Sequence, residues 1–68
     1  MKILKTKDSY FNLNAIDVFG FNDRYKNFSI ANFTFKIDSS KYQEFRALLD
    51  EFLMNSEIVL DFSIYVVD

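Results

Sequence analysis

The chain has 68 residues and a net charge of −2, with no cysteine, no histidine and a single glycine. This composition excludes disulfides, zinc or copper sites built from Cys and His, Ser-His-Asp catalysis and glycine-rich phosphate loops. A domain of this size without such staples depends on apolar burial, and nine Phe and four Tyr supply it.

Strand candidates fill the N-terminal third. Residues 2–5 form a short candidate whose pairing the sequence leaves open. Residues 10–21, YFNLNAIDVFGF, are rich in aromatic and β-branched side chains, and apolar residues fall on both faces from Ala15 to Phe21. Because a strand with two apolar faces is typical of the middle of a sheet, we place residues 15–21 at the centre of the predicted sheet.

A polar loop follows. Residues 22–27, NDRYKN, contain Asn and Asp, whose side chains bond to nearby backbone and favour turns. Since residues 28–37 again read as a strand, the loop predicts a β-hairpin.

The alternation within residues 28–37 is inconsistent. Phe28 and Ile30 fall on even positions and the later apolar residues on odd positions, so in one regular strand the two sets would point to opposite faces. Two interpretations stay open: a β-bulge near residues 31–32 resets the register, or Phe28 and Ile30 lie on the outer face. The apolar residues at odd positions are Phe33, Phe35 and Ile37.

Residues 39–56, SSKYQEFRALLDEFLMNS, predict the one helix of the domain, because apolar residues recur at i, i+3, i+4 and i+7. Ser40 followed by Gln43 matches a capping box at its start. The stripe expected to face the sheet consists of Tyr42, Phe45, Leu48, Leu49, Phe52 and Leu53.

The C-terminal segment alternates over residues 58–66, which predicts a half-buried strand. Of two possible positions, we prefer antiparallel pairing with residues 15–21. The expected fold is a single α+β domain over residues 1–68. It is a β-β-α-β arrangement with one amphipathic helix on one face of a three-stranded, or four-stranded, mainly antiparallel sheet. With no signal peptide and no membrane-length apolar run visible, we expect a cytoplasmic protein.

One helix and a small sheet cannot bury thirteen aromatic side chains, so some are expected at the surface. The sequence therefore predicts a non-enzymatic protein-binding module without cofactor or metal. Its partner is another protein or a second copy in a homodimer, and not a membrane. The candidate interaction surface consists of Phe28, Ile30, Val59, Asp61, Tyr65, Val67, Asp50 and Glu51.

Charge is divided along the chain, with +3 over residues 1–36 and −5 over residues 37–68. The acidic stretch from Asp38 to Asp61 is suited to mimic nucleic-acid phosphates in the basic groove of another protein. Residues with AT-rich codons fill nearly half of the chain, as in low-GC bacteria and their phages. In size and composition the chain resembles small phage-encoded inhibitors such as anti-CRISPR proteins, although no motif identifies such a family. An inhibitor encoded by a phage or mobile element is one form of the protein-binding hypothesis.

The alternative hypothesis is single-stranded nucleic-acid binding, in which sheet aromatics stack on bases beside basic residues. It ranks second because the net charge is negative and no RNA-binding motif is present. The aromatic candidates are Tyr10, Phe11, Tyr25, Phe28 and Tyr65, and the basic candidates are Lys2, Lys5, Lys7, Arg24 and Lys26.

Overall fold

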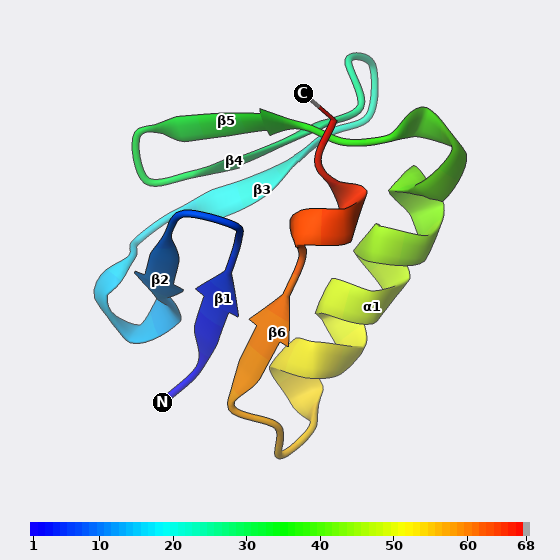
Figure 1. Cartoon of the computed structure of the whole chain (residues 1–68). Coiled ribbons are helices and arrows are strands. Elements are labelled where there is room, and N and C mark those ends of the chain that lie inside the picture. Colours follow the sequence, from blue (N-terminus) through cyan, green and yellow to red (C-terminus); the bar gives the residue numbers. More distant parts are fainter. Residues whose placement is uncertain (68) are drawn as a thin grey trace.

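The computed structural model describes residues 1–67 and confirms a small α+β domain with one α-helix against mostly antiparallel strands (Figure 1). The strands are β1 (Ile3–Lys5), β2 (Tyr10–Asn12), β3 (Phe19–Asn22), β4 (Asn27–Ile30), β5 (Phe33–Lys36) and β6 (Val59–Asp61). The helix is α1 (Tyr42–Met54), and the 3-10 helices are η1 (Leu13–Ala15), η2 (Ser39–Lys41) and η3 (Ser63–Tyr65).

The strands form two three-stranded sheets rather than one. Sheet A has the order β2-β1-β6, with β1 antiparallel to β2 and parallel to β6. Sheet B has the order β3-β4-β5 and is antiparallel throughout. The preferred pairing of the C-terminal strand with residues 15–21 is therefore wrong. β6 instead pairs with β1, because η1 interrupts residues 10–21 and the fully buried Leu4 makes β1 a central strand.

A tight turn explains the conflicting parities of residues 28–37. They form β4, a two-residue turn at residues 31–32, and β5, so Ile30 lies opposite Phe33. Phe28 and Ile30 then face the core, where both are fully buried. Both interpretations of residues 28–37, a bulge and an outward position of Phe28 and Ile30, are therefore wrong. Residues directly opposite each other in a hairpin point to the same face, so Ile30 and Phe33 share a face although their positions differ by an odd number.

The C-terminal strand is shorter than its alternation predicts. The Asp61 carboxylate accepts hydrogen bonds from the N–H group of Ser63, at 2.9 Å, and from its hydroxyl. This Asx-type turn competes with continued strand pairing and begins η3. Val66 then forms an isolated bridge with Ile37 beyond β5, so the chain end returns to sheet B.

The helix begins later than predicted, at Tyr42, and the capping box of Ser40 and Gln43 does not form. Asp38 accepts hydrogen bonds from the N–H group and the hydroxyl of Ser40, at 3.0 and 2.7 Å, and caps η2. A carboxylate is a stronger acceptor than a hydroxyl, so the turn starts at Asp38.

The core is an aromatic cluster between sheet B, α1 and the segment after β6. The ring of Phe28 lies 5.0 Å from that of Phe21, 5.5 Å from Phe45 and 5.7 Å from Phe62, measured between centroids. Such pairs each add about 0.5–1.5 kcal/mol beyond the burial of area. Four members of the predicted helical stripe are buried, Leu48 is half-buried and Leu53 is 40% exposed.

The turn between β4 and β5 gives a test of this hairpin. Ala31 has φ of 53°, a left-handed conformation that glycine adopts without strain. We expect Ala31→Gly to raise the free energy of unfolding by up to about 1 kcal/mol in urea denaturation. Ala47→Gly, at an exposed position inside α1, should instead lower it by about 0.5–1 kcal/mol. Equal losses in both variants would contradict the turn.

Candidate interaction surface

Sheet A has one face against the core and the other in solvent. Leu4 and Phe11 are buried and Leu60 is half-buried, so these side chains mark the core side. Successive residues of a strand point to opposite faces, and their neighbours therefore form the outer face. The outer face of sheet A consists of Ile3, Lys5, Tyr10, Asn12, Val59 and Asp61.

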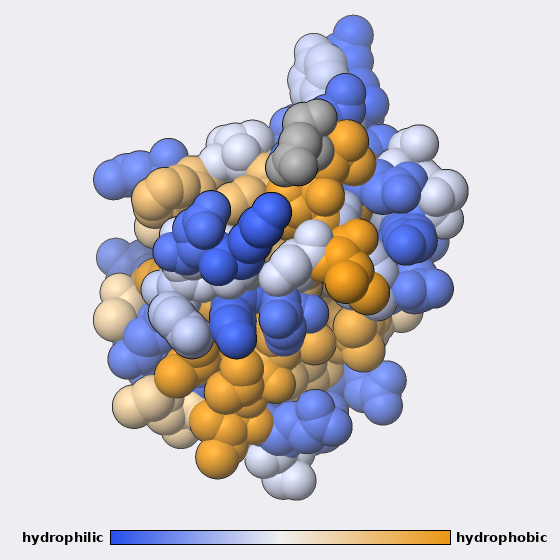
Figure 2. Space-filling model, viewed as in Figure 1, coloured by the Kyte–Doolittle hydropathy of each residue, from blue (hydrophilic) through white to orange (hydrophobic). Residues whose placement is uncertain are grey.

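The register divides this face into a mainly apolar row and a polar row. Tyr10 is 71% exposed and Val59 is 48% exposed, which is high for side chains of their kind. Figure 2 shows hydrophobic atoms gathered where β1 and β6 begin, and hydrophilic atoms nearer the other ends of these strands. The rows across the three strands are Asn12–Ile3–Val59 and Tyr10–Lys5–Asp61.

The polar row is linked by charge. The ammonium group of Lys5 lies 5.6 Å from the ring centroid of Tyr10, within the range of a cation–π contact. The hydrogen bonds from Ser63, together with the nearby charge of Lys5, hold the pKa of Asp61 below its usual value. Lys5 therefore lies between an aromatic ring and an ionised carboxylate in one exposed row.

Sheet B presents a different outer face, made of small and polar residues. Ser29 and Thr34 are exposed neighbours whose hydroxyl oxygens lie 3.3 Å apart. The outer face of sheet B consists of Gly20, Asn22, Asn27, Ser29, Thr34 and Lys36.

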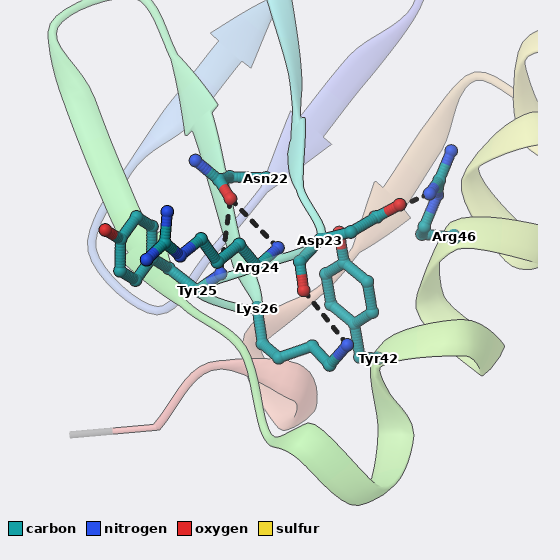
Figure 3. A network of polar contacts seen from close by, with 7 residues as sticks. All are labelled: Asn22, Asp23, Arg24, Tyr25, Lys26, Tyr42 and Arg46. Atoms are coloured by element: carbon teal, nitrogen blue, oxygen red, sulfur yellow. Dashed lines mark hydrogen bonds and ion pairs between the residues drawn. The ribbon is translucent and has the colours of Figure 1, made fainter.

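The β3–β4 loop is a second exposed feature, and its backbone is held by its own side chains (Figure 3). The side-chain oxygen of Asn22 accepts hydrogen bonds from the N–H groups of Arg24 and Tyr25, at 3.0 and 3.2 Å. Lys26 has φ of 54°, and its ammonium group donates to the backbone carbonyl of Asp23 at 3.0 Å. These bonds hold the loop backbone in one conformation.

The loop is also anchored to α1 through Asp23 (Figure 3). Its carboxylate accepts hydrogen bonds from the hydroxyl of Tyr42 at 2.5 Å and from the guanidinium group of Arg46 at 2.6 Å. The ion pair is solvent-exposed, so its own contribution is small. The hydroxyl of Tyr42, whose ring is fully buried, is the stronger link between loop and helix.

The proton affinities follow from this geometry. The hydrogen bond from Tyr42, then the contacts with Arg46, hold the pKa of Asp23 below its usual value. Burial and the hydrogen bond to Asp23 raise the pKa of Tyr42 to about 12. Both shifts favour a neutral hydroxyl that donates to an ionised carboxylate at neutral pH.

The loop tip presents an aromatic ring beside cations. Tyr25 is 61% exposed, and the guanidinium carbon of Arg24 lies 5.4 Å from its ring centroid. A shallow groove of about 450 Å³ runs along the tip. The side chains that line the groove are Tyr25, Lys26, Lys36, Ile37, Asp38, Ser39 and Val67.

The eight residues predicted as one interaction surface are separated in the structure. Phe28, Ile30 and Tyr65 are core residues, so their assignment to the surface is wrong. The alternation of residues 58–66 predicts Tyr65 on the outer side of a long strand, but η3 turns it inward and its hydroxyl donates to Glu44 at 2.9 Å. Of the others, Val59 and Asp61 lie on the outer face of sheet A, Val67 lines the loop groove, and Asp50 and Glu51 are exposed on α1.

The acidic stretch is partly used for internal contacts. The carboxylate of Asp38 caps η2, that of Asp61 accepts hydrogen bonds from Ser63, and that of Glu44 accepts the hydrogen bond from Tyr65. The exposed acidic residues near the end of α1 and the start of β6 are Asp50, Glu51 and Glu57.

Two features were missed from the sequence. Ile3 and Asn12 belong to the outer face of sheet A, but strands of three residues are too short for a recognisable alternation. The bond between Tyr42 and Asp23 was also missed. The polar tip of a tyrosine within an apolar stripe is a signal for such a partner, although it does not say which residue supplies it.

Comparisons with protein-family models, curated proteins and solved structures give no match to this chain. In the described part of the chain, no helix is long and apolar enough to cross a membrane. Residues 1–67 also contain no group of three or more acidic side chains placed to hold a metal ion.

The link between Tyr42 and Asp23 predicts a pH-dependent stability. The pKa of tyrosine is about 10 when unfolded and is raised to about 12 for Tyr42 in the fold, so its contribution is complete below pH 10 and lost as pH rises towards 12. At pH 7 we expect Tyr42→Phe to lower the free energy of unfolding by about 1–2 kcal/mol.

Above pH 10 the gap between the wild type and Tyr42→Phe should narrow, as measured by urea unfolding at several pH values. The control is Tyr25→Phe, at an exposed ring, which should leave the stability curve unchanged. A constant gap from pH 7 to pH 12 would show that the hydroxyl of Tyr42 is not held by Asp23.

Proposed function

We propose that the chain is a non-enzymatic, cytoplasmic protein-binding module whose contact surface is the outer face of sheet A. The observation that carries this proposal is the exposure of Tyr10 and Val59 on one face of a three-stranded sheet. Exposed aromatic and aliphatic groups rimmed by charge are typical of protein contact surfaces. The absence of cysteine agrees with a reducing compartment.

The face of sheet A is a better contact surface than the acidic stretch. Two carboxylates of that stretch accept hydrogen bonds from Ser40 and Tyr65, and a third, Asp61, belongs to sheet A itself. The polar row of sheet A places Lys5 beside Tyr10 and Asp61, so it offers both charges and an aromatic ring at one place. Tyrosine is one of the residue types that often supply the strongest contacts in an interface.

The partner in this proposal is a folded protein. If the chain is an inhibitor encoded by a phage or mobile element, the partner is a host protein. The small size of the chain and its large share of residue types with AT-rich codons support an inhibitor of this kind. The lack of His and Cys supports a binding role over catalysis, because the common nucleophile and base pairs need them.

Site-specific photo-cross-linking in the producing cell tests the contact surface. We expect a photoreactive phenylalanine analogue at Tyr10 to give a discrete cross-linked protein adduct, because Tyr10 is largely exposed on the outer face of sheet A. The matched control places the same analogue at Ser29 on the outer face of sheet B, where no adduct is expected. Adducts from Ser29 alone, or from neither position, would reject the proposal.

A second candidate function is single-stranded nucleic-acid binding at the β3–β4 loop. One observation favours it: the exposed ring of Tyr25 carries the guanidinium group of Arg24, and Lys26 and Lys36 line the adjoining groove. A base can stack on such a ring while the cations contact phosphates. Asp38 also lines the groove, and this acidic group weakens the case.

Fluorescence anisotropy with a labelled oligothymidine tests this second function. Stacking contributes about 1–3 kcal/mol per base, so Tyr25→Ala should weaken binding by about fivefold or more. The affinity should also fall with salt, since phosphate contacts release counterions. Tyr10→Ala is the control for a general loss of aromatic surface. Salt-independent binding, or equal losses in both variants, would reject a site at Tyr25.

A further inference from the structure

β6 is an edge strand of sheet A, and the direction of its backbone groups is fixed by its bonds to β1. The N–H group of Ile3 donates to the carbonyl of Ile58 at 2.8 Å, and the N–H group of Phe62 donates to the carbonyl of Lys5 at 2.8 Å. In a parallel ladder the residues between these bonded positions point the other way. The N–H and C=O groups of Val59 and Asp61 are therefore directed away from β1, and within residues 1–67 no backbone group bonds to them.

Sheet A has a second edge at β2, but it is less suited to pairing. Phe11, at its centre, is already buried, so an added strand would cover little further apolar surface. Leu60, at the centre of β6, is half-buried, and Val59 beside it is 48% exposed. An added strand at β6 would satisfy four backbone groups and cover both side chains.

We propose that a second copy of this chain pairs with β6, antiparallel and about a two-fold axis at Leu60, to form one six-stranded sheet. The proposal goes beyond the proposed function, because the second copy pairs with the edge of sheet A and leaves the outer face, including Tyr10, open to another protein. A two-fold arrangement is the commonest form of homodimer, and an edge strand can take up an added strand through its backbone groups.

The spacing of the free groups selects this register. When Leu60 faces Leu60 of the second copy, Val59 faces Asp61, and each such pair exchanges two hydrogen bonds. All four free groups of each chain are then used. A register centred on Asp61 would place two carboxylates opposite each other, which is unfavourable.

The side chains agree with this register on both faces. On the core side the two Leu60 side chains meet as a non-hydrogen-bonded pair, the closer of the two antiparallel pair types. On the outer side Val59 lies beside Asp61 of the second copy, while each Asp61 keeps its own neighbour Lys5. The outer faces of the two sheets then form one continuous surface.

This pairing makes opposite predictions for two substitutions at Val59. Val59→Asp places a second carboxylate opposite Asp61, so the dissociation constant of the dimer should rise by about tenfold or more. Val59→Lys places an ammonium group there instead, so the constant should stay within about threefold of the wild type or fall. Sedimentation equilibrium, with a protomer of 8.1 kDa, measures both.

Ala47→Asp and Ala47→Lys, on the exposed side of α1, make the same changes in net charge away from β6 and should leave the constant unchanged. If Val59→Lys weakens the dimer as much as Val59→Asp, the copies pack through the apolar row and strand pairing is wrong. A wild type that stays monomeric at about 1 mM also overturns the proposal.

Hydrogen exchange gives an independent readout on the unmodified protein. The amides of Val59 and Asp61 should become protected as protein concentration rises, because they enter hydrogen bonds in the dimer. The amides of Tyr10 and Asn12, on the opposite edge strand β2, should not change. Protection at β2 instead of β6 would overturn the proposal. Adducts from a photoreactive group at position 10 test the proposed function separately, since they do not depend on β6.

Discussion

The packing of aromatic rings around the fully buried Phe28 is the interaction on which the rest of the structure depends. Phe28 lies on the central strand of sheet B and contacts Phe21 beside it, Phe45 of α1 and Phe62 after β6. With no disulfide available, this cluster joins segments that are otherwise distant in the chain. These rings can pack together only when the chain turns after β4, α1 lies against sheet B and the segment after Asp61 turns inward.

The sequence predicts those parts of the fold whose signals are local. The helix predicted over residues 39–56 and the loop predicted at residues 22–27 follow from apolar spacing and turn chemistry, and the structure has α1 at Tyr42–Met54 and a turn between β3 and β4. The turn at residues 31–32 is hidden because Ala-Asn lacks the glycine that marks most tight hairpins. The early end of β6 is hidden because two hydrogen bonds from Ser63 to the Asp61 carboxylate override nine residues of alternation.

Prediction of the candidate surface fails for a related reason. Face assignments depend on register, and a turn or an early strand end moves every later side chain to another environment. Tyr65 follows such a point, whereas Phe28 precedes the turn at residues 31–32, and its face is misjudged because the turn before Phe33 and Phe35 is not recognised; both Phe28 and Tyr65 belong to the core. Val59 and Asp61 keep their predicted exposure, because they precede the point where β6 ends. The partner strand of β6 could not be identified, since the three residues of β1 carry no recognisable pattern.

The two outer sheet faces differ in a way that composition does not explain. One helix and one aromatic cluster cover a single face of each sheet, so both other faces meet solvent. The outer face of sheet B carries small polar groups such as Ser29 and Thr34, as expected for a face that stays in water. The outer face of sheet A carries Ile3, Tyr10 and Val59 in the same chain. A chain that can keep one outer face polar has no folding requirement for exposed side chains such as Tyr10 and Val59 on the other, and this contrast supports the proposal of a partner on sheet A.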